Sequence, residues 1–326
     1  MAHEIRDNMM FSVRQTPWHR QGVVLDHAPT TEEAILAAKL DWEVKKVPNY
    51  VHVDGRYIET ESRSIVRMSE RGPIILGTVS DRYEPVQNRE AFTVFDRLMQ
   101  ESGYTYETAG AVKNGRKVWI LARAAEGARV GDDDIRQYVA IITSHDGTMN
   151  LRLLPTAVRI VCNNTLTWAL QRGEEEGFTL RHTPSIHEKL DIAAKLLAAT
   201  QMSFAQAVQV FSHMQDTRIE PADAIRYWER VIPSLKRRGD SNTWRLAFDN
   251  IANAFLYGRG NKGETLWHAY NAMTEWVDHI RNTAGHRILD YAVFGEGGRI
   301  KRDGIAHARE IIADRVFAGP PLVSAN

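Results

Sequence analysis

The sequence contains a single cysteine and no long apolar run. One cysteine cannot form a disulfide within the chain and excludes a CxxC metal or redox pair, so a reducing compartment is expected. No window approaches ~18 uninterrupted apolar residues, and the first residues, MAHEIRDNMMF, carry charge and lack an apolar run of signal-peptide length. These absences predict a cytoplasmic protein without a membrane partner.

An excess of charge of one sign is also missing, because 41 basic residues balance 41 acidic ones. This balance argues against a protein coated with positive charge for indiscriminate binding of polyanions, so any nucleic-acid surface must be local. The 326 residues, 43% of them apolar, have a globular composition. They exceed the usual length of one compact domain, so two structural units, or one enlarged unit, are expected.

Turn residues divide the first half of the chain into short strands. Asp54-Gly55 between VHV and RYI, and Asn114-Gly115 between YTYETAGAV and RKVWILARA, tolerate the positive φ of tight hairpins. RSIVRM and PIILGTVS predict another hairpin. QYVAIIT and LRLLPTAVRIV predict two further strands.

Helices are expected between and after these strands. Thr30 and Glu33 form a capping-box pattern, NREAFTVFDRLMQ has helical spacing, and a helix is predicted to begin near Asn164. Beyond GEEEGFTLRHTPS, the spacing predicts one long amphipathic helix from Ile186 to Phe211. Further helices are predicted to start at Pro221 and Ser241 and to run over 264–281 and 303–316. We therefore predict an α+β fold. An antiparallel sheet of hairpins and a meander with packed helices occupies residues 1–180, and an all-helical part occupies 181–326.

The stretch from Ser144 to Leu166 gathers side chains that a cysteine hydrolase uses, namely His145, Asp146 and Cys162. The structural interpretation is that Asp146 begins a turn, that Cys162 ends the apolar run VRIVC in an inert environment, and that the adjacent asparagines cap a helix. The structural interpretation is favoured, and a hydrolase is kept as an alternative.

Residues that could hold a metal or a nucleotide occur at unsuitable spacing. His268, Glu275 and His279 share one side of a predicted helix, but no HExxH occurs, and that side is expected to face solvent. GRGNKGET imitates a phosphate loop, but Glu264 rather than lysine follows its second glycine. No cofactor is predicted.

Three basic clusters lie at predicted helix junctions with glycine nearby, where cations could approach phosphates. They comprise Lys236, Arg237, Arg238 and Arg245; Arg259 and Lys262; and Arg299, Lys301 and Arg302. If they converge, the helical part carries a local positive patch. The alternative is three separately solvated turns.

The Asn114-Gly115 hairpin offers a second candidate surface. Its tip carries Lys113, Arg116 and Lys117, and its arms carry Tyr104, Tyr106 and Trp119. Such a basic and aromatic mixture suits single-stranded DNA. Both tyrosines fall on one face of the strand, and the alternative is that this face belongs to the core.

Four segments together resemble a known family: MAHEI followed by TPWHRQG, then ILGTVSDRYEPVQNREAF, then SHDGT with VRIVCNNTL, and last GETLWHAYNAMTEWVDH. They are similar to the phage/plasmid-like family that contains the domain of unknown function numbered 932. The resemblance implies a mobile-element setting and supplies no activity, cofactor or catalytic residue. The order helix, meander, helix from Gln87 to Leu170 is also loosely similar to that of phage single-strand annealing recombinases.

The leading hypothesis is a nucleic-acid-binding protein of phage or plasmid DNA metabolism that binds or anneals single-stranded DNA. Lysines and arginines would neutralise phosphates and aromatic rings would stack on bases, so no covalent step is required and a binding protein is favoured over an enzyme. One alternative is a protein-interaction or counter-defence factor with an apolar patch on the helix starting near Ile186. Oligomerisation is compatible with each of these readings.

Overall fold

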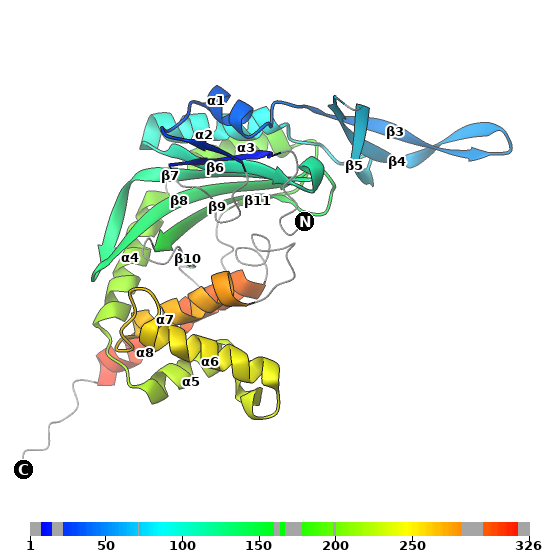
Figure 1. Cartoon of the computed structure of the whole chain (residues 1–326). Coiled ribbons are helices and arrows are strands. Elements are labelled where there is room, and N and C mark those ends of the chain that lie inside the picture. The colour runs from blue at the N-terminus through cyan, green and yellow to red at the C-terminus, as the bar shows by residue number, and fades with distance from the viewer. Residues whose placement is uncertain are drawn as a thin grey trace, which may run out of the picture. The chain divides into compact units, whose positions relative to one another are not determined.

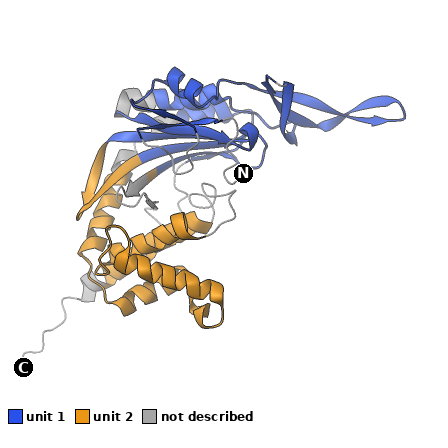
Figure 2. Cartoon of the chain, viewed as in Figure 1, with its two compact units in different colours: residues 1–125, 138–155, 177–200 blue, residues 126–137, 156–176, 201–326 orange. Residues whose placement is uncertain are grey.

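The computed structural model describes residues 8–14, 22–70, 72–159, 164–166, 178–197, 200–281 and 296–318 (Figure 1). The chain divides into two compact units (Figure 2). Unit 1 consists of Met1–Ala125, Tyr138–Pro155 and Gly177–Thr200, and unit 2 of Glu126–Gln137, Thr156–Glu176 and Gln201–Asn326. Whether residues 1–180 and 181–326 fold as separate domains stays a prediction.

Among the described residues, eight strands form a large sheet in the order β10-β9-β8-β7-β6-β1-β2, with β11 also paired to β9. The predicted strands of the meander are present in it, and β1 and β2 pair in parallel. The bounds are β1 (Met10–Val13), β2 (Val23–Leu25), β6 (Thr105–Val112), β7 (Lys117–Val130), β8 (Asp133–Ser144), β9 (Leu151–Arg159), β10 (Asn164–Leu166) and β11 (Phe178–Leu180).

Helices α1 (Thr31–Ala37), α2 (Asn88–Ser102) and α3 (Ile186–Leu197) lie on one face of this sheet (Figure 1). The core between them joins helix residues such as Phe92 and Phe95 to strand residues such as Ile120 and Leu153. The predicted capping box of α1 is confirmed, since the Glu33 amide donates to the Thr30 hydroxyl and the Thr30 amide donates to the Glu33 carboxylate. Alternation along the strands therefore commits one sheet face to apolar packing.

A smaller antiparallel sheet contains β3 (Val44–Val53), β4 (Arg56–Ser69) and β5 (Gly72–Ser80). Asp54 and Gly55 both have positive φ, 48° and 76°, so the predicted two-residue turn is confirmed. β5 pairs with β4 only from Ser62 to Ser69, so β3 and β4 continue beyond it as a two-stranded ribbon (Figure 1).

Unit 2 is mostly helical around its own apolar core. Its described helical elements are α4 (Thr200–Asp216), α5 (Pro221–Val231), η2 (Pro233–Gly239), α6 (Asn242–Tyr257), α7 (Leu266–Glu275), η3 (Trp276–Ile280) and α8 (Glu296–Ala318). Phe211, Trp228, Phe255, Trp267 and Tyr270 are buried together in the core. The predicted starts at Pro221 and Ser241 are confirmed, with Pro221 in the first turn of α5 and Ser241 as the N-cap of α6.

Three element predictions are wrong. The single long helix predicted from Ile186 to Phe211 is divided into α3 (Ile186–Leu197) and α4 (Thr200–Asp216). Asn164–Leu166 begins no helix but forms β10, whose backbone pairs with Ala157–Arg159 of β9. The last helix starts at Glu296 rather than near residue 303, although it includes Gly297 and Gly298. Glycine lowers intrinsic helix propensity by ~1 kcal/mol, but burial of Ile300, Ile305 and Ala308 on this helix outweighs that cost.

Candidate nucleic-acid interface

Lys301 does not belong to a surface cluster, contrary to the sequence expectation. It lies within α8, its side chain is 0% exposed, and its Nζ is 2.5 Å from Oδ1 of Asp278. Burial lowers the pKa of the Lys301 ammonium, and the Asp278 carboxylate acts in the opposite direction. An enclosed, paired ammonium cannot reach a phosphate, so we remove Lys301 from the candidate surface.

The two arginines beside it also lie in α8 instead of a turn. Arg299 is exposed and pairs with Asp303 at 2.9 Å, one helical turn away, while Arg302 is half-buried. With Lys301 buried, Arg302 half-buried and Asp303 beside Arg299, the third cluster is the weakest candidate for a polyanion.

The first cluster keeps most of its charge exposed. Lys236, Arg237 and Arg245 are exposed, and the part of the chain that the structure describes contains no acidic partner for them. Arg238 differs, because it pairs with Glu229 and its guanidinium carbon lies 4.6 Å from the ring centroid of Phe248. We call residues 236–245, which join η2 to the first turn of α6, the cationic segment.

The N-terminus of α6 lies within the cationic segment. Its N-cap, Ser241, makes no side-chain hydrogen bond to the first turn. Free amides and the positive end of the helix dipole favour an anion at such a position. The dipole therefore adds to the charge of the neighbouring lysine and arginines.

The second cluster follows the other end of α6. Arg259 and Lys262 are exposed, and Lys262 Nζ lies 3.5 Å from a carboxylate oxygen of Asp132, which is itself exposed. Such exposed pairs are weak. Because α6 has 16 residues, a length of about 24 Å separates the two clusters at 1.5 Å per residue. The clusters therefore do not converge on one point.

In unit 1 the predicted hairpin between β6 and β7 is confirmed, but its tip is a short 3-10 turn, Lys113–Gly115. Lys113, Asn114 and Gly115 all have positive φ. Arg67 Nε donates to the Asn114 carbonyl at 2.9 Å, and a Cβ on Gly115 would lie 2.8 Å from the Trp42 ring. The tip is thus held against the small sheet, while Arg116 stays exposed and Lys113 and Lys117 are half-buried.

The prediction that the tyrosines of this hairpin are exposed to a ligand is wrong. Tyr104 and Tyr106 are buried in the core under the helices, and the Tyr106 hydroxyl donates to the Phe92 carbonyl at 3.1 Å. Trp119, on the opposite sheet face, is half-buried and packs over Gly110 of the neighbouring strand. Neither tyrosine can stack on a base, because helices cover that face.

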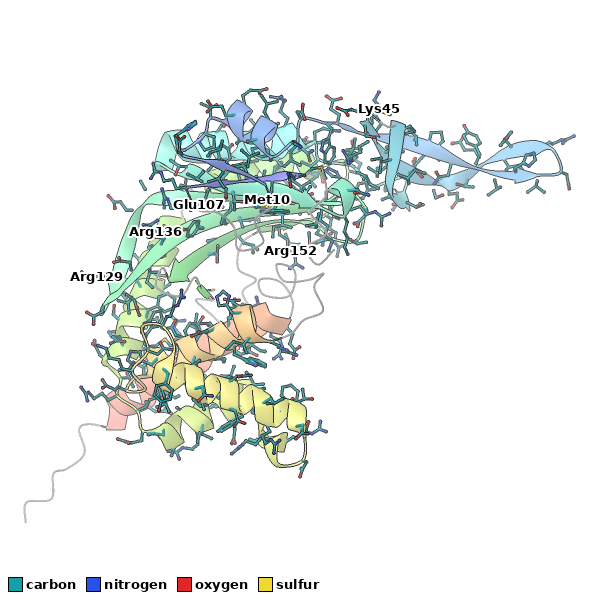
Figure 3. All side chains as sticks on the ribbon, in the orientation of Figure 1. Met10, Lys45, Glu107, Arg129, Arg136 and Arg152 are labelled. Carbon is teal, nitrogen blue, oxygen red and sulfur yellow. The ribbon has the colours of Figure 1, made fainter. Side chains whose placement is uncertain are left out.

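Sequence reasoning missed polar side chains on the sheet face that carries Trp119. Arg123 and Glu107 form an ion pair at 3.6 Å, and Arg152 extends from β9 (Figure 3). All three are half-buried. The sequence RKVWILARA indicates this face, because Trp119 and Arg123 alternate along the strand with the buried Val118, Ile120 and Ala122.

His145 lies in an enclosed polar cluster that ties a loop to the sheet. Its Nε2 is 3.0 Å from Asn88 Oδ1, while the Asn88 amide donates to the carbonyls of Leu40 and Trp42. The side chain is 0% exposed, and burial lowers its pKa to about 3. His145 is therefore neutral and inaccessible near pH 7, which disfavours the hydrolase alternative.

The other members of the proposed catalytic set do not strengthen it. Asp146 Oδ1 accepts from the Thr148 amide at 3.0 Å, as expected for a turn residue. Cys162 lies outside the described residues. In the described segments no three His, Cys, Asp or Glu side chains are grouped as metal ligands.

The side of the helix over 264–281 that was predicted to face solvent does so only in part, because Glu264 and His279 are exposed while its middle is enclosed. His268 and Asn271 are buried, as is every residue from Leu266 to Thr274. The Glu264 amide donates to Nδ1 of His268 at 3.3 Å, and the Asn271 side chain donates to the Trp267 carbonyl. Local hydrogen bonds to the backbone permit this burial of polar side chains.

Two of the three described large apolar side chains on the helix from Ile186 are internal. Ile186 and Leu190 are buried, and Ile192 is exposed. Instead, seven of the fifteen exposed large apolar side chains in the described residues lie in the small sheet: Tyr50, Val51, Val53, Tyr57, Ile58, Met68 and Ile75. The sequence indicates this exposure of apolar side chains, because VHV and RYI place apolar residues on both faces of one hairpin.

These features define an α+β protein of two compact units, and the cationic segment of unit 2 carries exposed cations without an acidic partner among the described residues. Residues 75–308 match the family described as Domain of unknown function (DUF932), and the chain belongs to this family. No curated protein and no solved structure matches the chain. Within the described segments, no helix has both the length and the apolar character needed to cross a membrane.

Proposed function

We propose that the protein binds nucleic acid, with single-stranded DNA as its ligand, and that it does so without catalysis. The observation that supports this best is the cationic segment, where Lys236, Arg237 and Arg245 are exposed beside the uncapped start of α6. Phosphates would take the place of the acidic partners that these side chains lack in the described part of unit 2.

The mode of binding differs from the one the sequence favoured. Tyr104 and Tyr106 are withdrawn as stacking platforms because they are buried. Binding would then depend mainly on phosphate neutralisation, which carries no sequence information. We therefore propose a class of ligand, and we expect the protein to show little preference among base sequences.

The biological setting is part of the same proposal. The four resembling segments favour a phage or plasmid protein of DNA metabolism, in which annealing of single strands is one task. The order of elements that suggested annealing loses its second helix, because Asn164–Leu166 forms β10. The single cysteine favours a cytoplasmic location. Annealing would be measured directly by pairing of complementary oligonucleotides in the presence of the protein.

The test is fluorescence anisotropy with a labelled oligothymidylate at about 50 and 200 mM NaCl, the range over which phosphate contacts lose much affinity. The triple variant Lys236→Ala/Arg237→Ala/Arg245→Ala should bind more weakly at low salt. It should also flatten the plot of log affinity against log salt by about 2, at ~0.7 per phosphate lost on a single strand.

The matched control is Arg226→Ala/Arg230→Ala, which removes two exposed arginines of α5 that already pair with Asp223 and Glu310. Its binding should stay close to that of the wild type. Absent binding, salt-independent binding, or equal losses in the two variants would exclude the cationic segment as the interface.

A second candidate, a protein-interaction or counter-defence factor, is favoured by one observation. Five large apolar side chains of the ribbon are exposed, and such surfaces in stable proteins commonly mark interaction sites.

A further inference from the structure

Tyr257 is the last residue of α6 and, at 82%, the most exposed large apolar side chain in the described part of the chain. The helix turns its other side to the core of unit 2. There Ala254 and Phe255 are buried, and the Phe255 and Trp228 ring centroids are 5.5 Å apart. This packing fixes the backbone of Tyr257 to the core and leaves its ring in solvent.

The turn that follows Tyr257 is fixed by close contacts. The Gly258 amide donates to the Ala254 carbonyl at 2.9 Å, and the buried Asn261 side chain donates to the same carbonyl at 2.8 Å. A Cβ on Gly258 would lie 2.3 Å from that carbonyl oxygen, so only glycine fits there. The turn therefore presents Arg259 and Lys262, both exposed, on an ordered backbone directly after the tyrosine.

The stretch of sequence that contains α6 has a local excess of positive charge. Residues 236–264 include six basic side chains and three acidic ones, although the whole chain has no net charge. Arg259 and Lys262 follow the C-terminus of α6, where they offset the negative end of the helix dipole that would otherwise repel a phosphate. A polyanion is thus attracted to both ends of α6, at the cationic segment and at the turn after Tyr257.

We propose that Tyr257 stacks on a base of the same single strand whose phosphates contact the cationic segment, so that the strand follows α6 from one end to the other. The inference rests on the proposed function and adds the contact to bases that phosphate neutralisation does not supply. Along a stacked strand one phosphate follows another about every 3.4 Å. The length of α6, about 24 Å, therefore corresponds to about seven nucleotides.

The exposed face of α6 has the chemistry that such a strand requires. Leu246, Asp249, Asn253 and Leu256 lie three or four residues apart on the side of Tyr257, and all of them are exposed. Asp249 is the only acidic residue of the helix. Apolar and amide side chains can lie against sugars and bases while the cations at the two ends reach phosphates. Because every base has a π-face, the tyrosine would stack without selecting a sequence.

The experiment compares Tyr257→Ala and Tyr257→Phe with the wild type by fluorescence anisotropy, on a labelled oligothymidylate of about 15 nucleotides, long enough to follow the whole of α6. Tyr257→Ala should weaken binding about 10-fold, toward the lower end of what one base stacked on an aromatic ring contributes. Tyr257→Phe keeps the ring and should bind like the wild type. The slope of log affinity against log salt should be the same in all three proteins, because no phosphate contact is removed.

Tyr57→Ala is the matched control, because Tyr57 is a tyrosine of unit 1 that is 76% exposed, and its removal should leave binding unchanged. A second control changes the ligand. An abasic strand of the same length offers phosphates without bases, so wild type and Tyr257→Ala should bind it equally. Circular dichroism of each variant verifies that it is folded.

The outcomes separate the stacking contact from the proposed function. Salt-dependent binding that is equal in the wild type and Tyr257→Ala would overturn the stacking contact and leave the cationic segment as the interface. An equal loss in Tyr257→Phe, or the same loss on the abasic strand, would also overturn it, because neither depends on a ring stacked on a base. A wild-type protein that binds no oligothymidylate would exclude the proposed function itself, and the stacking contact with it.

Discussion

Replacing His145 with glutamine should make the folded protein less sensitive to acid. The histidine ring is 0% exposed, and burial lowers its pKa to about 3, against 6.5 for the unfolded chain. Above pH 6.5 the ring is neutral in both states and contributes no pH dependence. Between pH 6.5 and 3 only the unfolded state binds the proton, so stability falls as the pH falls.

The magnitude follows from the two pKa values. Between pH 6.5 and 4.5 the unfolded ring is protonated while the folded ring stays neutral. Each of these two pH units lowers the free energy of unfolding by about 1.36 kcal/mol. His145 should therefore remove about 3 kcal/mol of stability between pH 7.5 and 4.5, a large part of the ~5–15 kcal/mol typical of a folded protein. Glutamine cannot take up this proton, and its amide can still donate to Asn88.

The assay is urea unfolding at pH 7.5, 6.0 and 4.5, followed by tryptophan fluorescence. The quantity compared is the change in unfolding free energy with pH, so any constant cost of the substitution cancels. Burial also lowers the pKa of His182, but this residue is present in both proteins and cancels as well. Equal pH dependence in wild type and His145→Gln would refute the enclosed, neutral state of His145.

Two further predictions concern buried contacts. Lys301→Met removes the ammonium that pairs with buried Asp278, and it should lower the free energy of unfolding in urea by about 3–5 kcal/mol. The double variant Lys301→Met/Asp278→Leu should recover most of this loss. Equal stability of the single and the double variant would contradict the pairing. Gly110→Val should lower stability by about 1–3 kcal/mol in thermal unfolding, because a Cβ there lies 2.5 Å from the Trp119 ring and 2.6 Å from the Met10 Cβ. Trp119→Leu removes only the first of these clashes and should restore part of the loss, so no recovery at all would contradict the contact with Trp119.

Local features were predictable because short-range chemistry specifies them. Positive φ at Asp54 and Gly55 makes the turn between β3 and β4, and the Thr30 side chain satisfies a free amide at the start of α1. Asn164 shows the limit of such reasoning. An asparagine suits a helix cap, but pairing with β9 made its segment a strand.

The candidate site was predictable only as a list of charged and aromatic residues. Lys236 and Arg237 are exposed as expected, whereas Lys301, which has the same glycine-rich and basic surroundings in the sequence, is buried against Asp278. The sequence is compatible with Tyr106 as a platform for base stacking, but in the structure α2 covers its face of the sheet.

By itself, the sequence determined the α+β class, the hairpin turns, most helix starts and the absence of an internal disulfide, since each depends on residues close together in the chain or on composition. Only the tertiary structure decided which cations and aromatic rings reach solvent and that the ribbon from Tyr50 to Glu59 stands uncovered. Burial depends on the packing of segments far apart in sequence, and no local pattern encodes which segments will meet.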